Sequence, residues 1–140
     1  MIHGSCLCGG VRFEVDEIPL MMSCHCSMCR KASGGAFGTF AHARPEQVRY
    51  LAGQDLIARY ESSPGNQRGF CRVCGSIVPV LGEDRPNVVI PAGTLDDDPG
   101  VRPALHIFVG SKAPWWEIRD ALPQFEQWVP GYDPEGRRSQ

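Results

Sequence analysis

The segment Cys24-His25-Cys26-Ser27-Met28-Cys29 is preceded by Cys6-Leu7-Cys8 and followed by Cys71-Arg72-Val73-Cys74, and these clusters contain all seven cysteines of the chain. Cysteines separated by one or two residues can bind one metal ion, because the short intervening backbone turns both thiolates toward a common centre. Seven thiols correspond to one zinc site with four ligands and a second site with three. The sequence therefore predicts two zinc ions, and disulfides are a weaker alternative because seven is an odd number.

Length and composition indicate one globular domain with a modest core. The chain has 140 residues, of which 42% are hydrophobic and 21% are charged, as in ordinary globular proteins. Its 16 glycines and 12 prolines favour turns and short strands over long helices. We therefore expect a mainly β domain.

Charge and hydropathy argue against two classes of partner. The net charge is −2 and the basic residues are scattered, so we expect no binding of nucleic acid, which requires a dense basic face. No apolar run approaches the roughly 18 residues of a membrane span, and no signal-peptide pattern is visible. We therefore expect a cytoplasmic protein without membrane association, in which clustered thiols stay reduced and bind metal.

Alternating apolar and polar residues predict a series of short strands. The expected strands cover residues 10–15, 36–41, 77–81, 88–90 and 105–109, and another leads through Met21 and Met22 into the middle cysteine cluster. Two further segments, residues 48–51 and 56–60, are predicted to pair as a hairpin across residues 52–55.

Helix is expected to be scarce. The best candidate runs from Ala113 to Leu122, with Pro114 at its first position and Pro123 ending it. The prediction is a single domain of antiparallel sheets with zinc knuckles and little helix over residues 1–128. A flexible C-terminal tail is predicted for residues 129–140.

The cysteines can be divided between two sites in two ways. The Cys71 and Cys74 pair needs two more thiolates, supplied either by the first cluster or by the middle one. Only the first choice uses every thiol, so we favour it. The predicted four-cysteine cluster then consists of Cys6, Cys8, Cys71 and Cys74. The predicted three-cysteine cluster consists of Cys24, Cys26 and Cys29.

The two clusters are expected to have different functions. Four cysteine ligands close a tetrahedral site, which is typical of structural zinc. Three protein ligands leave one position for water or substrate, which is typical of catalytic zinc. Because three thiolates leave the metal unit with one negative charge, activation of a substrate thiol as its thiolate is favoured over generation of hydroxide.

Other interpretations of the clusters stay open. A histidine could complete the second site and make it structural, and the candidates are His25, His3, His42 and His106. His25 lies between two ligands, so its side chain is expected to point away from the metal. The four-cysteine cluster could hold iron and sulfur, and the last cluster could be a redox pair, although it lacks a βαβ context. A non-catalytic zinc-stabilised module that binds a small thiol or a protein partner is the alternative to an enzyme.

Several motifs resemble the glutathione-dependent formaldehyde-activating enzyme (GFA) family. They follow one another through most of residues 2 to 128, at Gly4 to Val11, Cys24 to Lys31, Phe70 to Gly75, Gly93 to Asp96, His106 to Phe108 and Ala113 to Trp116. The resemblance implies a β-tent of antiparallel sheets, structural zinc at the four-cysteine cluster and catalytic zinc at the three-cysteine cluster. It also implies a carbon–sulfur lyase that condenses formaldehyde with glutathione to S-(hydroxymethyl)glutathione.

Three residues are candidates for contact with a glutathione-like substrate. Arg30 and Lys31 follow the three-cysteine cluster and could bind a carboxylate, although a solvated basic pair is an alternative. Trp115 and Trp116 are adjacent, so we expect one in the core and the other, Trp115, at the wall of a pocket. His106 is interpreted as a strand histidine with its hydrogen bonds satisfied.

Overall fold

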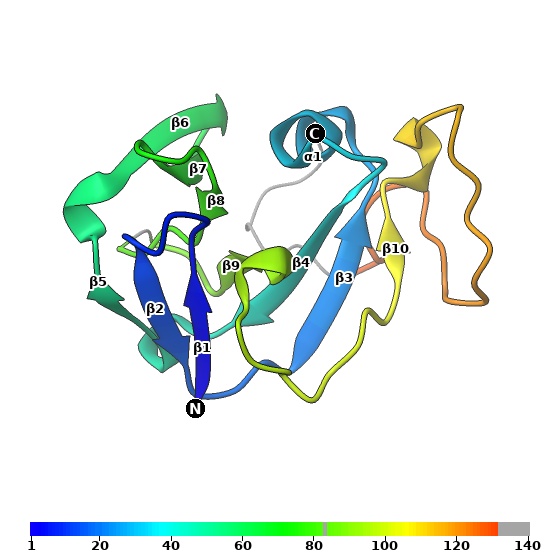
Figure 1. Cartoon of the computed structure of the whole chain (residues 1–140). Helices are drawn as coiled ribbons and strands as arrows, with labels where there is room; N and C mark the ends of the chain where they lie inside the picture. Colours follow the sequence, from blue (N-terminus) through cyan, green and yellow to red (C-terminus); the bar gives the residue numbers. More distant parts are fainter. Residues whose placement is uncertain (83, 132–140) are drawn as a thin grey trace.

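Ten short strands form three sheets in the described residues, 1–82 and 84–131 of a computed structural model (Figure 1). The first sheet, in the order β1-β2-β5, contains β1 Ile2–Ser5, β2 Arg12–Val15 and β5 Val48–Ala52. The second, in the order β10-β3-β4-β9, contains β3 Leu20–Cys24, β4 Gly38–Ala43, β9 Val88–Pro91 and β10 His106–Ile107. The third, in the order β6-β7-β8, contains β6 Ile57–Ser63, β7 Asn66–Cys71 and β8 Ile77–Val78.

The predicted class, a mainly β domain of antiparallel sheets with little helix, is confirmed. The pairing of β10 with β3 is parallel, and the other strand pairs are antiparallel. The predicted strands are present with shifted ends, since the strand expected at 36–41 covers Gly38–Ala43 and the one expected at 56–60 covers Ile57–Ser63. The strand expected at 105–109 ends early because Phe108 adopts a left-handed backbone with φ 55°. Short 3-10 turns lie between strands at η1 Pro45–Gln47, η2 Gln54–Leu56 and η3 Ala92–Thr94, and η4 Val109–Ser111 follows the last strand.

The second sheet separates two groups of buried side chains, because successive residues of a strand face opposite sides. On one face, Ala41 of β4 belongs to the main core together with Phe13 of the first sheet. On the opposite face, Met22 and Cys24 of β3 lie beside Phe40 of β4. The strand register therefore places a cysteine at the end of a buried apolar face.

The α-helix among the described residues, α1 Ser27–Ser33, begins inside the middle cysteine cluster, where the sequence predicts none. Cys26 caps it, because its Sγ accepts a hydrogen bond from the Cys29 N–H at 3.3 Å. Gly34 ends it in a left-handed conformation with φ 70°. The helix thus holds two cysteines one turn apart.

The predicted helix from Ala113 to Leu122 is wrong, since these residues form turns and irregular backbone. Tertiary hydrogen bonds replace helical ones here. The Asp120 carboxylate contacts the His106 ring, and Lys112 Nζ donates to the Ala113 carbonyl at 3.1 Å. Trp115 and Trp116 are both exposed, at 68% and 41%, so the expectation that one of them lies in the core is also wrong.

The predicted hairpin across residues 52–55 is wrong as well, because its two strands belong to different sheets. Strand β5 pairs with β2, whereas β6 pairs with β7. Gly53 lies between them with φ 79°, and a Cβ on it would meet the Gly10 carbonyl oxygen at 2.1 Å. The chain therefore turns against the first sheet at Gly53 and continues into the third sheet instead of folding back.

Most of the predicted C-terminal tail, residues 129–140, falls on residues 132–140, which lie outside the described residues. Within the described part, Trp128 still packs on Phe108, with ring centroids 5.1 Å apart. None of the helices described has the length and hydrophobicity of a membrane span.

Candidate metal centres

The four-cysteine cluster brings together side chains from both ends of the chain's N-terminal half. The sulfur atoms of Cys6, Cys8, Cys71 and Cys74 all lie within 4.8 Å of one another. Cys8 Sγ lies 3.5 Å from Cys6 Sγ and 3.8 Å from Cys71 Sγ. Zinc–sulfur bonds of about 2.3 Å in a tetrahedron place sulfurs about 3.8 Å apart, so the spacing fits one four-coordinate ion. A disulfide requires about 2.05 Å, and the seven cysteines are free thiols.

Two tight turns build this cluster. After β7 the chain turns at Gly75, whose φ is 79° and whose N–H donates to the Cys71 carbonyl at 2.7 Å. After β1 it turns at Gly9, whose φ is 76° and whose N–H donates to the Cys6 carbonyl at 2.9 Å. Ser76 joins the turns, because its Oγ accepts the Leu7 N–H at 2.9 Å. The C-x-C and C-x-x-C segments therefore fold into one centre between the first and third sheets.

The three-cysteine cluster lies where β3 meets α1. Cys24 is the last residue of β3, Cys26 caps the helix and Cys29 lies in its first turn. Their sulfurs also lie within 4.8 Å of one another, and Cys24 and Cys29 are buried. Both groups of cysteines could hold a metal ion, and both correspond to the predicted partition.

Crowding makes the ionisation of all three thiols unfavourable without a cation. Hydrogen bonding with Cys26 and then with Cys29, together with burial, raises the pKa of Cys24 far above its ordinary value. The contacts with Cys24 and then Cys29 lower the pKa of Cys26 instead. Without a metal ion, a thiolate at Cys26 is therefore stabilised by two neighbouring thiols. Three thiolates in so small a volume would repel one another, and a divalent cation would offset this repulsion.

His25 lies between two of these cysteines but points away from them, as predicted. Its ring is fully buried, and its Nε2 lies 2.8 Å from Nδ1 of His106. The His106 Nε2 lies 3.0 Å from the Asp120 carboxylate, so His106 has partners for both ring nitrogens. Burial, with the charge of His106 as the next cause, lowers the pKa of His25 to about 4. Neutral His25 therefore anchors the loop that carries the cluster.

The other histidines are not grouped with the sulfur atoms of the three-cysteine cluster either. His3 Nδ1 lies 2.8 Å from the Asp97 carboxylate. His42 is buried, and among the described residues its Nδ1 has no hydrogen-bond partner. Within the described part of the chain, the metal-ligating residues grouped with Cys24, Cys26 and Cys29 are these three alone.

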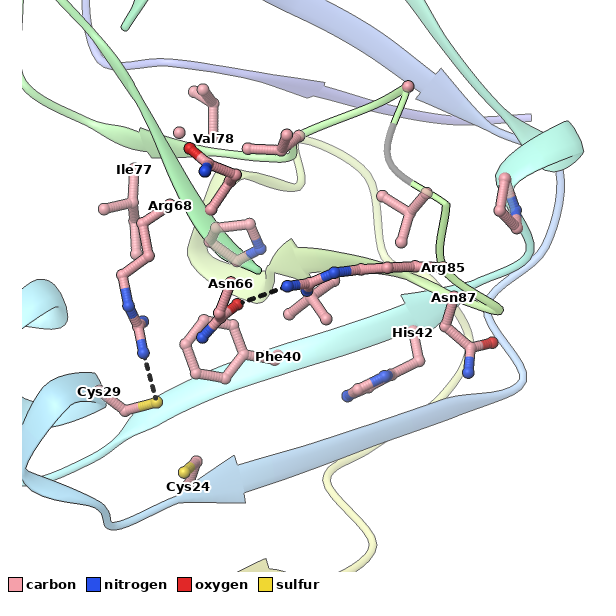
Figure 2. A pocket seen from close by; sticks show the side chains of 18 of the residues that line it. Cys24, Cys29, Phe40, His42, Asn66, Arg68, Ile77, Val78, Arg85 and Asn87 are labelled. Atoms are coloured by element: carbon pink, nitrogen blue, oxygen red, sulfur yellow. Dashed lines mark hydrogen bonds between the residues drawn. The ribbon is translucent and has the colours of Figure 1, made fainter. Parts of the chain in front are cut away.

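A cavity of about 130 Å³ adjoins the three-cysteine cluster (Figure 2). Cys24 and Cys29 form part of its wall, and the third sheet covers it from the opposite side. Arg68 of β7 points toward the cluster, with its Nη2 3.7 Å from Cys29 Sγ. Its Nε donates to Ser62 Oγ at 2.9 Å, which fixes the guanidinium at the border between cysteines and cavity.

The three residues predicted to contact substrate do not line this cavity. The Arg30 Nε donates to the His25 carbonyl at 3.4 Å, so it supports the backbone of the cluster. Lys31 is exposed on α1, and Trp115 is exposed in the segment after η4. Their predicted contact with substrate remains a prediction.

Sequence reasoning missed Arg68, and it considered His42 only as a possible metal ligand, whereas both residues line the cavity. Arg68 lies 39 positions after Cys29, the partner of its guanidinium, so sequence adjacency could not reveal the contact. The sequence contains one weak indication of its position. Arg68 lies three residues before Cys71 in the same strand, and Cys71 is predicted to join Cys6 and Cys8. His42 follows from strand register, since β4 places it on the same face as Phe40.

Comparisons with known proteins agree with this geometry. The family model described as glutathione-dependent formaldehyde-activating enzyme matches residues 1–111. A Halomonas elongata relative named as a glutathione-dependent formaldehyde-activating enzyme is 32% identical over 128 residues, covering 84% of this chain and 81% of the relative. An uncharacterized lyase of Schizosaccharomyces pombe is 30% identical over 75 residues, covering 53% of each chain.

A solved structure has a similar fold. The crystal structure of a Rhodobacter sphaeroides protein is similar with a TM-score of 0.57 and 26% sequence identity, covering 72% of this chain and 91% of that one. The family match includes all seven cysteines and both clusters. The chain therefore belongs to the glutathione-dependent formaldehyde-activating enzyme family.

Proposed function

We propose that this protein is a zinc-dependent carbon–sulfur lyase that activates a thiol such as glutathione for reversible addition to a small aldehyde such as formaldehyde. Family membership supports glutathione-dependent formaldehyde activation, and a relative named as a lyase supports an enzyme. The single observation that carries the proposal is the three-cysteine cluster, which has no fourth cysteine, histidine or carboxylate in its group among the described residues and adjoins a cavity.

The donor sets suit two zinc ions, one at each cluster, because thiolates are preferred ligands of zinc. Cys6, Cys8, Cys71 and Cys74 would hold the structural ion, and Cys24, Cys26 and Cys29 the catalytic one. Zinc at the three-cysteine cluster would supply an open coordination position at which a substrate thiol is held as thiolate near neutral pH.

Other residues of the protein hold the cysteine sulfurs in place and set the charge and water access around them. The cap between Cys26 and the Cys29 N–H fixes two of the sulfurs, and the His25–His106 contact fixes the loop between them. The Arg68 guanidinium lies beside Cys29 and offsets the negative charge of three thiolates. Phe40 and Ile107, which pack with Cys24 and Cys29 at the cavity, would limit the access of water to these two cysteines.

The test is the rate of thiol–aldehyde adduct exchange, followed by NMR with zinc-loaded protein, glutathione and formaldehyde. We expect faster exchange with wild type than without protein, and loss of the effect in Cys26→Ser. Met28→Leu is the matched control, since Met28 lies in the same segment but supplies no ligand, and it should retain the effect. Protein carrying two zinc ions that leaves exchange unchanged with every thiol tried would refute the proposal.

The alternative, a non-catalytic zinc-stabilised module, predicts a filled fourth position. Cobalt substitution separates the two cases, because its visible spectrum reports the ligands around the metal. A spectral change on addition of glutathione supports an open position at the three-cysteine cluster. An unchanged spectrum, with adduct exchange also unchanged, favours the binding module.

A further inference from the structure

We propose that the cavity beside the three-cysteine cluster binds the carbonyl substrate, and that this substrate is an aldehyde with an apolar body, about six non-hydrogen atoms in all. Arg68 donates a hydrogen bond to its oxygen. The inference rests on the proposed function, thiol addition to an aldehyde, and extends it from formaldehyde to a larger substrate class.

The size and lining of the cavity support an apolar occupant. Its volume is about 130 Å³, and an apolar protein cavity of about 150 Å³ accommodates benzene. Formaldehyde has only two non-hydrogen atoms and would fill a small part of this space. Apolar side chains from β4, β9, β10, the loop after β8 and the C-terminal segment form much of the wall, namely Phe40, Val89, Ile107, Val80 and Trp128. Polar side chains complete it, namely His42, Asn66, Gln67, Arg68, Arg85 and Asn87, and Arg85 Nη2 donates to the Gly65 carbonyl and to Asn66 Oδ1.

The position of the cavity places such an occupant against the reacting sulfur. Cys24 and Cys29 belong to its wall, whereas Cys26 does not. A carbonyl group at this end of the cavity would lie next to a thiolate held at the three-cysteine cluster, and its apolar body would lie among Phe40, Val89 and Ile107, which line the same cavity. The arrangement brings the two reactants together from different directions.

Arg68 is the donor best placed to bind the aldehyde oxygen. Its Nη2 lies 3.7 Å from Cys29 Sγ, and its Nε is held by Ser62 Oγ. Ser62 is in turn contacted by Asn66 Nδ2 at 3.3 Å, so the guanidinium is fixed by a network and not by one contact. Arginine stays protonated at any pH of interest and offers several N–H groups, which leaves donors for a second acceptor beside the sulfur.

The chemical step is balanced without an oxidant or reductant. The thiol loses its proton to solvent on binding as thiolate. The sulfur then forms a bond to the carbonyl carbon, the carbon–oxygen π bond breaks and its electron pair moves to oxygen. Arg68 stabilises the negative charge on that oxygen, which takes a proton from water to give the hydroxyl of the adduct. The reverse sequence releases thiol and aldehyde.

Binding is tested first, with a probe that cannot react. Isovaleramide has the isobutyl group and carbonyl oxygen of isovaleraldehyde, with one additional non-hydrogen atom, but forms no thiol adduct. Titrated into zinc-loaded protein, it should shift the NMR methyl resonances of Val80, Val89 and Ile107, and these shifts should weaken in Val89→Phe. Val80→Phe is the second filling variant, in case the first does not fold. Absence of these shifts overturns the inference.

Kinetics test the same site with isovaleraldehyde and formaldehyde. We expect the ratio of kcat/KM for isovaleraldehyde to that for formaldehyde to fall at least tenfold in Val89→Phe or Val80→Phe. Arg68→Met should lower kcat about a hundredfold with two zinc ions still bound, and Arg68→Lys should recover part of the loss. Arg12→Lys, an exposed arginine of the first sheet, is the control that should resemble wild type.

The two proposals fail in different ways. If formaldehyde turns over but isovaleraldehyde does not, and isovaleramide does not bind, the inference about the cavity is wrong while the proposed function stands. If neither aldehyde turns over with any thiol, the proposed function is wrong and the inference falls with it. Loss of zinc in Arg68→Met would show that Arg68 supports the metal site and does not bind the oxygen.

Discussion

At the scale of single residues, Cys26 combines two physical tasks. Its Sγ accepts the Cys29 N–H at 3.3 Å and so caps α1, and the same atom belongs to the three-cysteine cluster. A cap satisfies one of the N–H groups that the start of a helix leaves without a partner. The cluster and the helix therefore stabilise each other, although α1 is too short to be stable alone.

Substitutions at Cys26 should separate these tasks. Serine is a good cap but a poor zinc ligand, whereas alanine is neither. We expect both Cys26→Ser and Cys26→Ala to lose one zinc ion per chain, measured by elemental analysis. With the ion of the four-cysteine cluster still bound to both variants, we expect Cys26→Ala to be less stable than Cys26→Ser by about 1 kcal/mol in urea denaturation. Equal stability of the two variants would show that the sulfur does not act as a cap.

His42 should make stability depend on pH. Burial lowers its pKa from 6.5 in the unfolded chain to about 4. Between these values the unfolded chain binds a proton that the folded chain does not, so the free energy of unfolding falls as the pH falls through this window. From pH 7 to pH 5 the expected loss from this residue is about 2 kcal/mol.

The measurement is urea denaturation of wild type and His42→Leu at both pH values. Acid also displaces metal from cysteines, but that loss is common to the two proteins and cancels in the comparison. Between pH 7 and pH 5, the free energy of unfolding should fall by about 2 kcal/mol less in His42→Leu than in wild type. His3→Gln, at an exposed position, is the control and should follow wild type. An identical loss in His42→Leu and wild type would contradict the prediction.

The grouping of the cysteines into one cluster of four and one of three could be predicted, because it follows from their spacing in the sequence. Arg68 could not, since its approach to Cys29 depends on how the third sheet covers the second. The His25–His106 contact also depends on tertiary structure, because β10 pairs with β3 in parallel and brings together residues 81 positions apart. Local patterns do not report such contacts.

At the scale of elements, α1 depends on the conformation of the residue that follows it. Gly34 has φ 70°, and its N–H donates to the Arg30 carbonyl at 2.8 Å, which closes the helix. A Cβ at this position would meet nothing within 4 Å, so only the backbone conformation opposes a larger side chain. The left-handed region costs a residue with a Cβ about 1 kcal/mol.

Gly34→Ala should therefore destabilise the protein by about 1 kcal/mol in thermal or urea unfolding. Gly93→Ala is a matched control, because Gly93 also has open space around it but no positive φ. It should change stability by less than about 0.5 kcal/mol. Equal effects of the two substitutions would mean that the left-handed cap does not limit the stability of α1.

Element positions were more predictable than their pairing. The alternation of apolar residues identified most strands, because each strand has one buried face. It could not show that β5 and β6 separate into different sheets, which depends on the close approach of Gly53 to Gly10. The helix was missed because its signals, a cysteine cap and a seven-residue length, are weaker than the prolines that suggested a helix at 113–122.

At the scale of the whole molecule, the four-cysteine cluster connects the first and third sheets, which also share a group of packed apolar side chains that includes Tyr50 and Val78. Cys6 and Cys8 follow β1 of the first sheet, and Cys71 ends β7 of the third. A structural zinc ion contributes on the order of 10 kcal/mol to folding, which is comparable to the total stability of a small domain. The three-cysteine cluster connects only β3 to the adjacent α1.

A strong chelator should therefore remove metal in two phases. The three-ligand site should release its zinc first, without change in the far-ultraviolet circular dichroism, because the sheets remain joined. Release from the four-cysteine cluster should be slower and coincide with loss of β structure, because that ion holds the first and third sheets together. A metal-sensitive dye and circular dichroism recorded on the same sample measure the two events.

Two variants assign the phases. Cys26→Ser should lack the fast phase and keep the slow one, since it alters only the three-cysteine cluster. Cys71→Ser should unfold at much lower temperature than Cys26→Ser, because Cys71 is fully buried and its loss opens the centre between the sheets. If unfolding instead accompanied the fast phase, or if Cys71→Ser were as stable as Cys26→Ser, the three-cysteine cluster would carry the fold. The three-cysteine cluster would then have the structural role that we predict for the four-cysteine cluster.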